Sequence, residues 1–384
     1  MKYDIVCFSH LRWNFVYQRP QHLLSRFSKS GRVFFIEEPV WDVGKETISI
    51  KQVNKNIWVI VPHLFSNTDR NFLLNKKKEV VDYVLREMQI VDYIFWYYSP
   101  MALPYSSHAE PALIIYDCMD ELSSFKNAPA TLKENENKLI QKADVMFMGG
   151  YSLYHAKKHL HYNAYPFPSS IDKEHFFTAR LKTCKEDLYK NIPHPRLGFY
   201  GVIDERMNMQ LLAGIAGKKP HWQFILIGPI AKINEKSIPA LPNIHYLGAK
   251  RYEELPAYLS GWDIAIMPFA LNEATRYISP TKTPEFLAAG KPVISTSITD
   301  VVKPYGEKNF VAIADTADEF TAAAENIFNT ILVDRHSYDT WLKNVDSFLE
   351  GMSWDKTWDD MKTVIEMAMQ KKEMKNLDKS EAYV

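Results

Sequence analysis

Short apolar segments alternate with helical patterns along almost the whole chain. The apolar segments are rich in Ile, Val, Phe and Tyr and rarely alternate with polar residues, which is typical of parallel strands covered on both faces. The sequence predicts such strands at 3–9, 32–37, 57–62, 93–98, 112–117 and 145–149, and again at 196–201, 223–227, 244–247, 264–268, 292–296 and 310–314. The pattern therefore predicts an α/β protein with two successive halves, each built on its own sheet.

A change in composition separates the two halves. Residues 165–172 contain two prolines and break the rhythm, and the segment from there to about Pro195 is polar, so we interpret this stretch as an interdomain linker. We expect one Rossmann-like domain at 1–172 and a second at 190–350. Apolar residues recur at helical spacing over 353–370, and the polar residues 371–384 are expected to form a disordered tail.

Length and composition narrow the class of protein. The 384 residues are enough for two domains, and equal totals of 46 basic and 46 acidic residues give a net charge of zero. No global field attracts nucleic acid, so any anion site has to be local. The odd number of cysteines, Cys7, Cys118 and Cys184, is typical of reduced thiols. We see no signal peptide and no membrane-length apolar run, and expect a cytoplasmic protein.

The stretch 276–297 predicts a local anion site. Thr283 is a good helix N-cap, Pro284 fits the first helical position, and Gly290 can end the helix. The free N–H groups of this helix start face a loop that carries two hydroxyls and an ammonium: Ser279, Thr281 and Lys282. This combination suits a phosphate or diphosphate, and Glu285 can accept hydrogen bonds from a neighbouring sugar hydroxyl.

Residues 284–294, Pro-Glu-Phe-Leu-Ala-Ala-Gly-Lys-Pro-Val-Ile, resemble the donor-binding motif of nucleotide-sugar glycosyltransferases with the GT-B fold. The likeness is to the retaining group 1 (family 4-like) enzymes, which carry two glutamates eight positions apart. It implies two Rossmann-like domains with parallel sheets facing a central cleft, a terminal helix at 353–370 that crosses back to the first domain, and a ribose contact from Glu285. Tyr277 stands where the first glutamate is expected, which leaves the stereochemical outcome open. Glu273 is a candidate substitute through a loop shift, and the alternative is that the first glutamate is missing.

Other residues of the second half fit the same donor. The resemblance implies that Arg206, after the turn at Gly201, binds the diphosphate; the alternative is a surface pair with Asp204 or Glu205. Gly228 ends a strand and allows a close backbone approach to the nucleotide, although a plain tight turn is equally consistent. The signature loop adds residues that could touch the donor sugar: Asn272, Glu273, Thr275 and Arg276.

We predict neither a metal nor a separate cofactor. No Asp-x-Asp pair stands at a strand end, and no Cys/His cluster has zinc spacing. The first strand is followed by residues 8–13, Phe-Ser-His-Leu-Arg-Trp, which lack the glycine-rich phosphate loop of dinucleotide-binding and P-loop proteins. Arg206 and Lys282 would instead stabilise the departing diphosphate.

The first half carries candidate acceptor-side residues. His10 follows the first strand in a loop dense in His, Arg, Trp and Asn, and is a candidate proton carrier or a structural histidine. In related glycosyltransferases a His-Asp pair lies near the transferred sugar; here Met119 takes the histidine position and Asp120 remains. Asp117 or Asp120 could bind sugar hydroxyls or move a proton, or act as a helix N-cap. The basic helical edges at 73–78 and 157–159 are candidates for peripheral membrane contact or are solvated faces.

These observations together predict transfer of a sugar from a UDP- or GDP-type donor to a hydroxyl acceptor in cell-surface polysaccharide or glycolipid assembly. We expect a metal-independent, retaining enzyme whose departing phosphate oxygen accepts the acceptor's proton. The alternatives are a sugar-nucleotide epimerase on the same fold, which the Asp117/Asp120 pair keeps open, and a catalytically inactive sugar-nucleotide-binding protein. The expected partners are the nucleotide sugar and a glycan or lipid-linked acceptor, with no nucleic acid. The oligomeric state stays open.

Overall fold

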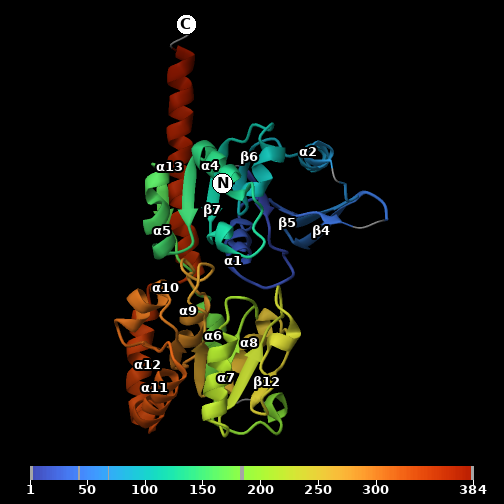
Figure 1. Cartoon of the computed structure of the whole chain (residues 1–384). Helices are drawn as coiled ribbons and strands as arrows, with labels where there is room; N and C mark the ends of the chain where they lie inside the picture. Colours follow the sequence, from blue (N-terminus) through green and yellow to red (C-terminus); the bar gives the residue numbers. More distant parts are fainter. Residues whose placement is uncertain (1–2, 42–43, 68, 182–185, 382–384) are drawn as a thin grey trace. The chain divides into compact units, whose positions relative to one another are not determined.

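The computed structural model describes residues 3–41, 44–67, 69–181 and 186–381, and the chain divides into two compact units (Figure 1). Unit 1 consists of Met1–Pro168 together with Asp355–Val384, and unit 2 consists of Ser169–Trp354. Each unit is organised around its own sheet of mainly parallel strands. The predicted fold class, two Rossmann-like α/β domains, is confirmed.

The sheet of unit 1 has the strand order β3-β5-β2-β1-β6-β7-β8-β9, and β4 pairs with β5 in the antiparallel sense. The central strand β1 is buried throughout its apolar run because helices cover both faces of the sheet. Since β1 and β7 both pair with β6 in parallel, their carboxyl ends meet at one edge. The strands are β1 (Asp4–Ser9), β2 (Val33–Glu37), β3 (Val40–Trp41), β4 (Thr47–Asn54), β5 (Ile57–Leu64), β6 (Tyr93–Tyr97), β7 (Leu113–Cys118), β8 (Val145–Met148) and β9 (Ala164–Pro166).

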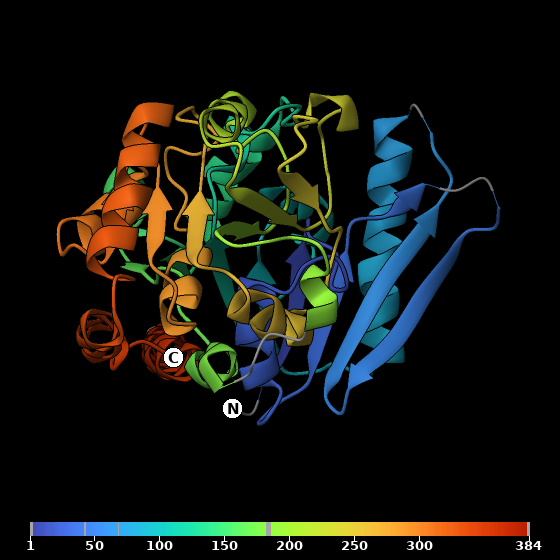
Figure 2. The same cartoon turned by 90° about the horizontal axis from the view of Figure 1, so that it is seen from below.

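The helices of unit 1 fill the connections between these strands. They are α1 (Arg19–Phe27), α2 (Arg70–Glu87), α3 (Leu103–Ser106), α4 (Leu132–Lys142) and α5 (Tyr151–Lys157), with short 3-10 turns at Pro100–Ala102, Leu122–Ser124 and Lys158–Leu160. Helix α2 begins at the N-cap Asp69, whose side chain accepts from the N–H groups of Asn71 and Phe72. It runs beside the long β4–β5 hairpin (Figure 2), where Lys76 pairs with Glu46 at 3.3 Å.

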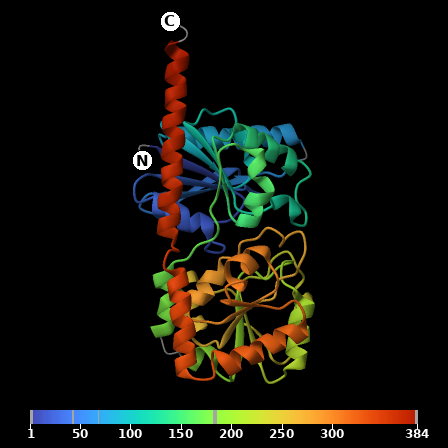
Figure 3. The ribbon, with the colours of Figure 1, turned by 90° about the vertical axis from the view of Figure 1, so that its left-hand side faces the viewer.

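Helix α13 (Trp354–Glu381) runs alongside the sheet of unit 1 (Figure 3). Near its start, Trp358 packs edge-on against Phe27 with ring centroids 5.7 Å apart, and Asp355 pairs with Arg26 at 2.8 Å. Further along, Lys372 pairs with Asp144 at 2.8 Å. We expected residues 371–384 to be disordered, but the helix continues to Glu381; residues 382–384 lie outside the described residues.

The sheet of unit 2 is parallel and has the strand order β12-β11-β10-β13-β14-β15. Its strands are β10 (Arg196–Tyr200), β11 (Gln223–Ile227), β12 (Ile244–Tyr246), β13 (Ile264–Met267), β14 (Val293–Ser295) and β15 (Val311–Ile313). Residues of β11 and β13 alternate between the two apolar clusters that cover the faces of this sheet. Both faces are therefore buried, which explains why the strands read as continuous apolar runs.

The helices of unit 2 are α6 (Lys173–Leu181), α7 (Met209–Lys218), α8 (Leu255–Ser260), α9 (Lys282–Ala288), α10 (Thr299–Val301), α11 (Ala317–Thr330) and α12 (Arg335–Leu349), with short turns at Glu186–Tyr189, Glu235–Ser237, Tyr252–Glu254 and Val302–Gly306. Two of them show clear start signals. Asn208 caps α7 by accepting from the N–H of Leu211, and Thr316 with Glu319 forms a capping box at α11.

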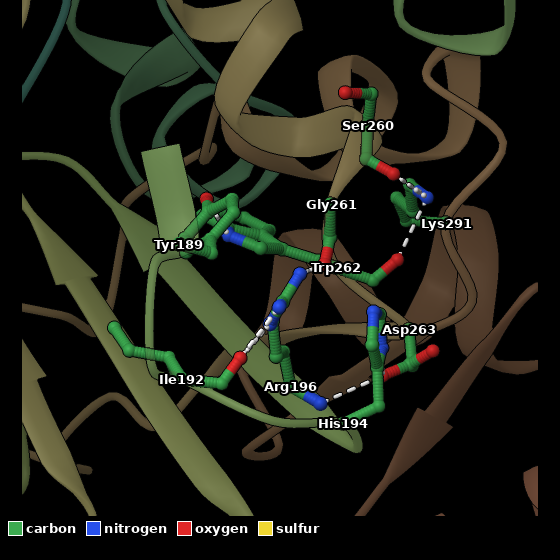
Figure 4. A network of polar contacts seen from close by, with 9 residues as sticks. All are labelled: Tyr189, Ile192, His194, Arg196, Ser260, Gly261, Trp262, Asp263 and Lys291. Atoms are coloured by element: carbon green, nitrogen blue, oxygen red, sulfur yellow. Dashed lines mark hydrogen bonds and ion pairs between the residues drawn. The ribbon is translucent and has the colours of Figure 1, made fainter. Parts of the chain in front are cut away.

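A polar network closes the amino edge of the unit 2 sheet (Figure 4). The guanidinium of Arg196 donates to the carbonyl oxygen of Ile192 at 2.8 Å and lies over the ring of Tyr189 at 4.6 Å. Asp263 accepts from the backbone N–H of Arg196 at 2.6 Å and bonds His194 at 2.7 Å. The network joins the segments before β10 and β13 at the edge opposite to the strand ends that position a ligand.

Two sequence expectations about secondary structure were wrong or incomplete. The segment interpreted as a linker contains helix α6, which packs in unit 2; there Phe176 is fully buried. Strand β4 was missed because most of its side chains are exposed, so it lacks the buried apolar pattern. Among the described residues, no helix is both long enough and apolar enough to cross a membrane.

Candidate functional site

Glycines follow three neighbouring strands of unit 2 at their carboxyl ends. Gly201 follows β10, Gly228 follows β11, and Gly248 lies just beyond β12, with φ values of 149°, 145° and 70°. The N–H of Gly228 donates to the carbonyl oxygen of Gly248 at 3.0 Å. A Cβ atom on Gly228 would lie 1.7 Å from the carbonyl oxygen of Gly201, so only glycine fits there. The three turns form a backbone floor at this edge.

Four residues gather beside the Gly201 turn, and we name them the Lys282 cluster: Tyr200, Thr281, Lys282 and Glu285. The Tyr200 hydroxyl donates to Oε2 of Glu285 at 2.5 Å. The Lys282 ammonium lies 3.9 Å from the same oxygen and donates to the Thr281 hydroxyl at 2.9 Å. A Cβ on Gly201 would lie 3.5 Å from Cε of Lys282, which places the ammonium arm directly over the glycine turn.

Burial sets the electrostatics of this cluster. Glu285 is 3% exposed, and burial raises the pKa of its carboxyl group, while the charge of Lys282 and the hydrogen bond from Tyr200 act in the opposite direction. Burial also raises the pKa of the Tyr200 phenol, with a further contribution from the charge of Glu285, so Tyr200 stays a donor. The side chain of Lys282 is 16% exposed. An ammonium with a hydroxyl can bind an anion, and the carboxylate can accept from a hydroxyl.

The start of α9 differs from the prediction. The helix begins at Lys282 with Thr281 as its N-cap residue, and no side chain caps it. Thr283 is fully buried and its hydroxyl contacts Sδ of Met267 at 3.6 Å, so it is not the N-cap. Pro284 lies in the first turn rather than at the first position, where a missing N–H still breaks no intrahelical bond. Lys282 is therefore fixed to the helix rather than carried by a loop.

Ser279, another predicted donor contact, is engaged by a different segment of unit 2. The hydroxyl of Ser169 donates to the carbonyl oxygen of Ser279 at 2.6 Å, and the N–H of Ser169 donates to the Ser279 hydroxyl at 3.4 Å. These bonds hold the loop that leads into α9. Contact between Ser279 and a donor stays a prediction.

Arg206 pairs with Asp204, as the alternative interpretation anticipated. Both carboxylate oxygens of Asp204 accept from Arg206, at distances between 2.8 Å and 3.1 Å. The pair is not a surface feature, since the side chain of Asp204 is only 6% exposed. The Asp204 carboxylate balances the charge of Arg206 at closer range than Glu285 balances that of Lys282. The diphosphate role of Arg206 stays a prediction.

A pocket of about 330 Å³ opens at the ends of β13 and β14 in unit 2. Its lining includes residues of the signature loop and of the segment after β14: Leu271, Asn272, Glu273, Thr275, Arg276, Ser297, Ile298 and Thr299. Thr275 is 1% exposed, and its hydroxyl donates to the carbonyl oxygen of Ala270, so it holds the loop in shape. Glu273 and Arg276 are exposed and pair at 3.6 Å. Like Leu271 and Asn272, they are exposed at the mouth of this pocket.

In unit 1, the predicted residues His10 and Asp120 follow β1 and β7 at the same edge of the sheet. Both are partly buried. Asp117, the alternative to Asp120, is fully buried and pairs with Arg19 at 2.9 Å. The Asp117 carboxylate is therefore occupied by Arg19 and shielded from solvent, which favours Asp120 for a sugar contact; the role of either residue stays a prediction. In the basic segment 157–159, Lys157 is buried between Glu121 and Glu136, so its side chain belongs neither to a solvated face nor to a membrane-contacting one.

Sequence reasoning missed two residues around the site, Tyr200 and Ser169. Tyr200 stands in the segment that was singled out for Gly201 and Arg206, and a strand end that carries a polar side chain beside a glycine is the signal that could have found it. Ser169 had no local signal, because its partner Ser279 is distant in the sequence. Cys184, the third predicted free thiol, lies outside the described residues.

The residues present give no indication of a metal centre. Within the described ranges, no group of three or more His, Cys, Asp or Glu side chains is arranged to hold a metal ion. Cys7 and Cys118 are free and buried. The expectation that catalysis proceeds without a metal stays a prediction.

Two Rossmann-like units, each built on a mainly parallel sheet, are the architecture of the GT-B fold. Residues 194–330 match the family described as Glycosyl transferases group 1. The resemblance inferred from residues 284–294 is thus confirmed: the second half of the chain is similar to group 1 glycosyl transferases. A curated relative is TuaH of Bacillus subtilis (strain 168), whose name gives it a provisional role as a teichuronic acid biosynthesis glycosyltransferase. It is 28% identical over 253 residues, which are 60% of this chain and 62% of TuaH, so the match spans less than two thirds of that relative.

Solved structures share the fold. A sucrose-phosphate synthase from Thermosynechococcus elongatus superposes with a TM-score of 0.72 at 14% identity, over 95% of this chain and 99% of the other. The trehalose-6-phosphate protein of E. coli bound with UDP-2-fluoro glucose gives 0.68 at 12%, over 96% and 99%. Anabaena HepE, in complex with UDP and glucose, gives 0.66 at 12%, over 94% and 99%. At these identities the likeness concerns the fold alone.

Proposed function

We propose that this protein transfers a sugar from a UDP- or GDP-type nucleotide sugar to a hydroxyl acceptor. The observation that carries the proposal is the Lys282 cluster, which combines a half-buried ammonium with a buried carboxylate at the backbone floor of a group 1 domain. In this proposal Lys282 and Thr281 hold the diphosphate, Glu285 accepts from the ribose, and the turns at Gly201 and Gly228 let the nucleotide approach the backbone.

The proposed chemistry needs a stabilised leaving group. As the bond between the sugar and the diphosphate breaks, negative charge grows on the phosphate oxygens, and the Lys282 ammonium lies where it can stabilise that charge. Arg206, steered by Asp204, adds a second cation. We propose a retaining reaction in which a departing phosphate oxygen accepts the proton of the acceptor hydroxyl, with Asp120 and His10 facing sugar and acceptor. Neither Tyr277 nor the other residues at the site then has to act as a strong base.

The proposed acceptor belongs to cell-surface polysaccharide or glycolipid assembly. Support comes from the likeness to TuaH, whose name refers to teichuronic acid, a pathway we carry over here only as a proposal. A lipid-linked acceptor would bring the protein to a membrane face. Lys157 has no part in that contact because it is buried, and Lys76 and Lys77 are already paired with Glu46 and Glu38.

The testing experiment is a donor screen followed by a transfer assay. UDP, GDP, ADP and TDP sugars are compared by thermal shift, since a ligand well above its Kd raises the melting temperature by mass action. The donor that binds is then incubated with glycan and lipid-linked acceptors, and the product is analysed by mass spectrometry. We expect one donor class to bind and its sugar to appear on an acceptor.

The other outcomes separate the competing functions. An isomerised sugar formed from donor alone, without acceptor, would favour the epimerase. Donor binding with neither hydrolysis nor transfer would favour a catalytically inactive sugar-nucleotide-binding protein. If none of the nucleotide sugars binds, the transferase, the epimerase and the inactive binding protein are all excluded.

A further inference from the structure

The turn that follows β7 in unit 1 is held on several sides. The N–H of Gly149 donates to the carbonyl oxygen of Cys118 at 2.9 Å, and a Cβ on Gly149 would lie 2.5 Å from the carbonyl oxygen of Met119. The Asp120 carbonyl oxygen accepts from the N–H of Leu122 at 3.1 Å and from the Cys118 thiol at 3.6 Å. The backbone on both sides of the Asp120 side chain is therefore fixed.

A buried ion network ties this turn to the helices behind it. The ammonium of Lys157, at the end of α5, lies 2.7 Å from Oε2 of Glu121 and 2.6 Å from Oε1 of Glu136 on α4. The hydroxyl of Tyr116 on β7 donates to the same Glu136 oxygen at 2.7 Å. Lys157 and Glu136 are each 7% exposed, and the Glu121 side chain is 15% exposed. Lys157 thus joins α5 to α4 and to the turn after β7, and Glu136 extends the network to β7.

Lys157 and Glu121 favour their charged forms although the network is buried. Burial alone would favour the neutral form of Lys157, but nearby negative groups and the hydrogen bonds to Glu136 and Glu121 outweigh it and raise the pKa of the ammonium. Burial likewise works against the ionised form of Glu121, yet the bonds from Lys157 and Ser123 lower its pKa. A charged, hydrogen-bonded pair of this kind resists rearrangement more than a neutral contact does.

We propose that Glu121, tied through Lys157 to Glu136, is a positioning residue that fixes the turn carrying Asp120. Asp120 is the residue that the proposed function directs at the transferred sugar, so this inference rests on that function. The donor-binding Lys282 cluster belongs to unit 2, whereas Glu121 belongs to unit 1. Loss of the tie should therefore affect turnover and leave donor affinity unchanged.

The test uses one severing variant, one conservative variant and one matched control. Glu121→Ala removes the tie but leaves the Lys157–Glu136 pair, so the fold is retained. In Glu121→Gln the amide oxygen can still accept from Lys157. Glu134→Ala removes a comparable pair, Glu134 with Lys138 at 2.6 Å, from the exposed face of α4. We expect Glu121→Ala to lower kcat by about 10- to 100-fold with donor Kd unchanged, as for a small misplacement of a reacting group. Glu121→Gln should recover most of the loss, and Glu134→Ala should behave as wild type.

A double-variant comparison separates positioning from a general structural effect. In the Asp120→Asn background Glu121→Ala should cost no further turnover, because the residue through which it acts is already disabled. An equal fold-loss in both backgrounds would overturn the inference. So would full transfer activity of Asp120→Asn, although the donor-binding part of the proposed function would then stand.

Hydrogen exchange tests the tie even if the protein transfers no sugar. The N–H groups of Leu122 and Ser124 bond the carbonyl oxygens of Asp120 and Glu121. We expect faster exchange over residues 119–124 in Glu121→Ala than in wild type or Glu134→Ala. Unchanged exchange would overturn the inference, whatever the outcome for the proposed function.

Discussion

The hydroxyl of Tyr200 donates a hydrogen bond of 2.5 Å to Glu285, a carboxylate that is 3% exposed. One partner is the last residue of β10 and the other lies on α9, so the bond joins the strand end before the Gly201 turn to the helix that carries Lys282. This bond supplies a donor to a carboxylate that burial would otherwise leave poorly solvated. It therefore fixes the carboxylate beside the ammonium before any ligand arrives.

Glu285→Gln should make the protein more stable near neutral pH while it weakens donor binding. The pKa of Glu285 is raised in the folded state by burial, so its ionised form opposes folding. Glu285 therefore contributes most to the free energy of unfolding below its unfolded-state pKa, and this contribution is lost as pH rises through its folded-state pKa. Urea unfolding at neutral pH should show a higher unfolding free energy for Glu285→Gln, and the gain should vanish toward acidic pH. The exposed Glu307→Gln is the control and should change stability by less than about 0.5 kcal/mol at either pH.

Tyr200→Phe should raise the pH below which donor affinity falls. The Tyr200 hydrogen bond lowers the pKa of Glu285, so its removal raises that pKa further. Donor affinity, which needs the carboxylate ionised, should then begin to fall at a higher pH than in wild type. Calorimetric Kd values across the acid range measure this. Tyr338→Phe loses a comparable bond, to the carbonyl oxygen of Gly290, and should keep the wild-type profile. An unshifted Tyr200→Phe profile would mean that Glu285 does not control binding.

Gly228→Ala should destabilise unit 2 and disrupt the backbone floor. The new Cβ would lie 1.7 Å from the carbonyl oxygen of Gly201, and the backbone has a φ of 145°. We expect a loss of about 3 kcal/mol in unfolding free energy, from steric displacement and strain. Gly217→Ala on α7 meets nothing within 4 Å and should be neutral or slightly stabilising. Equal unfolding midpoints for the two variants would contradict the packed-turn description.

Arg196→Met should lower stability without changing donor affinity. The substitution removes the guanidinium that bonds Ile192 and lies over Tyr189 at the amino edge of the sheet. A loss of about 2–4 kcal/mol in unfolding free energy is expected from charged hydrogen bonds and the ring contact. Arg335→Met, which breaks an exposed pair with Asp339, should cost less than about 0.5 kcal/mol. A weakened donor Kd in Arg196→Met would show that the two edges of the sheet are coupled.

The sequence predicted the fold well because buried parallel strands have a distinctive apolar pattern. Residues 276–297 also located Lys282 and Glu285, since the signals of a helix start and its neighbouring polar loop are local. The prediction failed where the cause lies in tertiary contacts. Thr283 has the chemistry of an N-cap, but its site is buried against Met267, so the helix begins earlier.

Contacts between distant segments had no sequence signal. The Tyr200–Glu285 bond and the tie from Glu121 to Lys157 join residues far apart in the chain. Asp117 and Asp120 could not be separated from sequence, because both lie at the carboxyl end of the same predicted strand. The structure distinguishes them, because Asp117 forms an ion pair with the buried Arg19.

The most direct test of the central claim is calorimetric titration of UDP, GDP, ADP and TDP into wild-type protein and Lys282→Ala. The Lys282 ammonium is expected to form a charge-assisted bond with the diphosphate, which is worth about 1.5–3 kcal/mol, or roughly 10- to 150-fold in Kd. Lys291→Ala removes an ammonium that bonds the carbonyl oxygen of Trp262 at the amino edge, and is the matched control. We predict that one nucleoside diphosphate binds wild type and Lys291→Ala with equal affinity, and binds Lys282→Ala at least about tenfold more weakly. Equal affinity for Lys282→Ala and wild type, or no binding of any nucleoside diphosphate, would contradict the account.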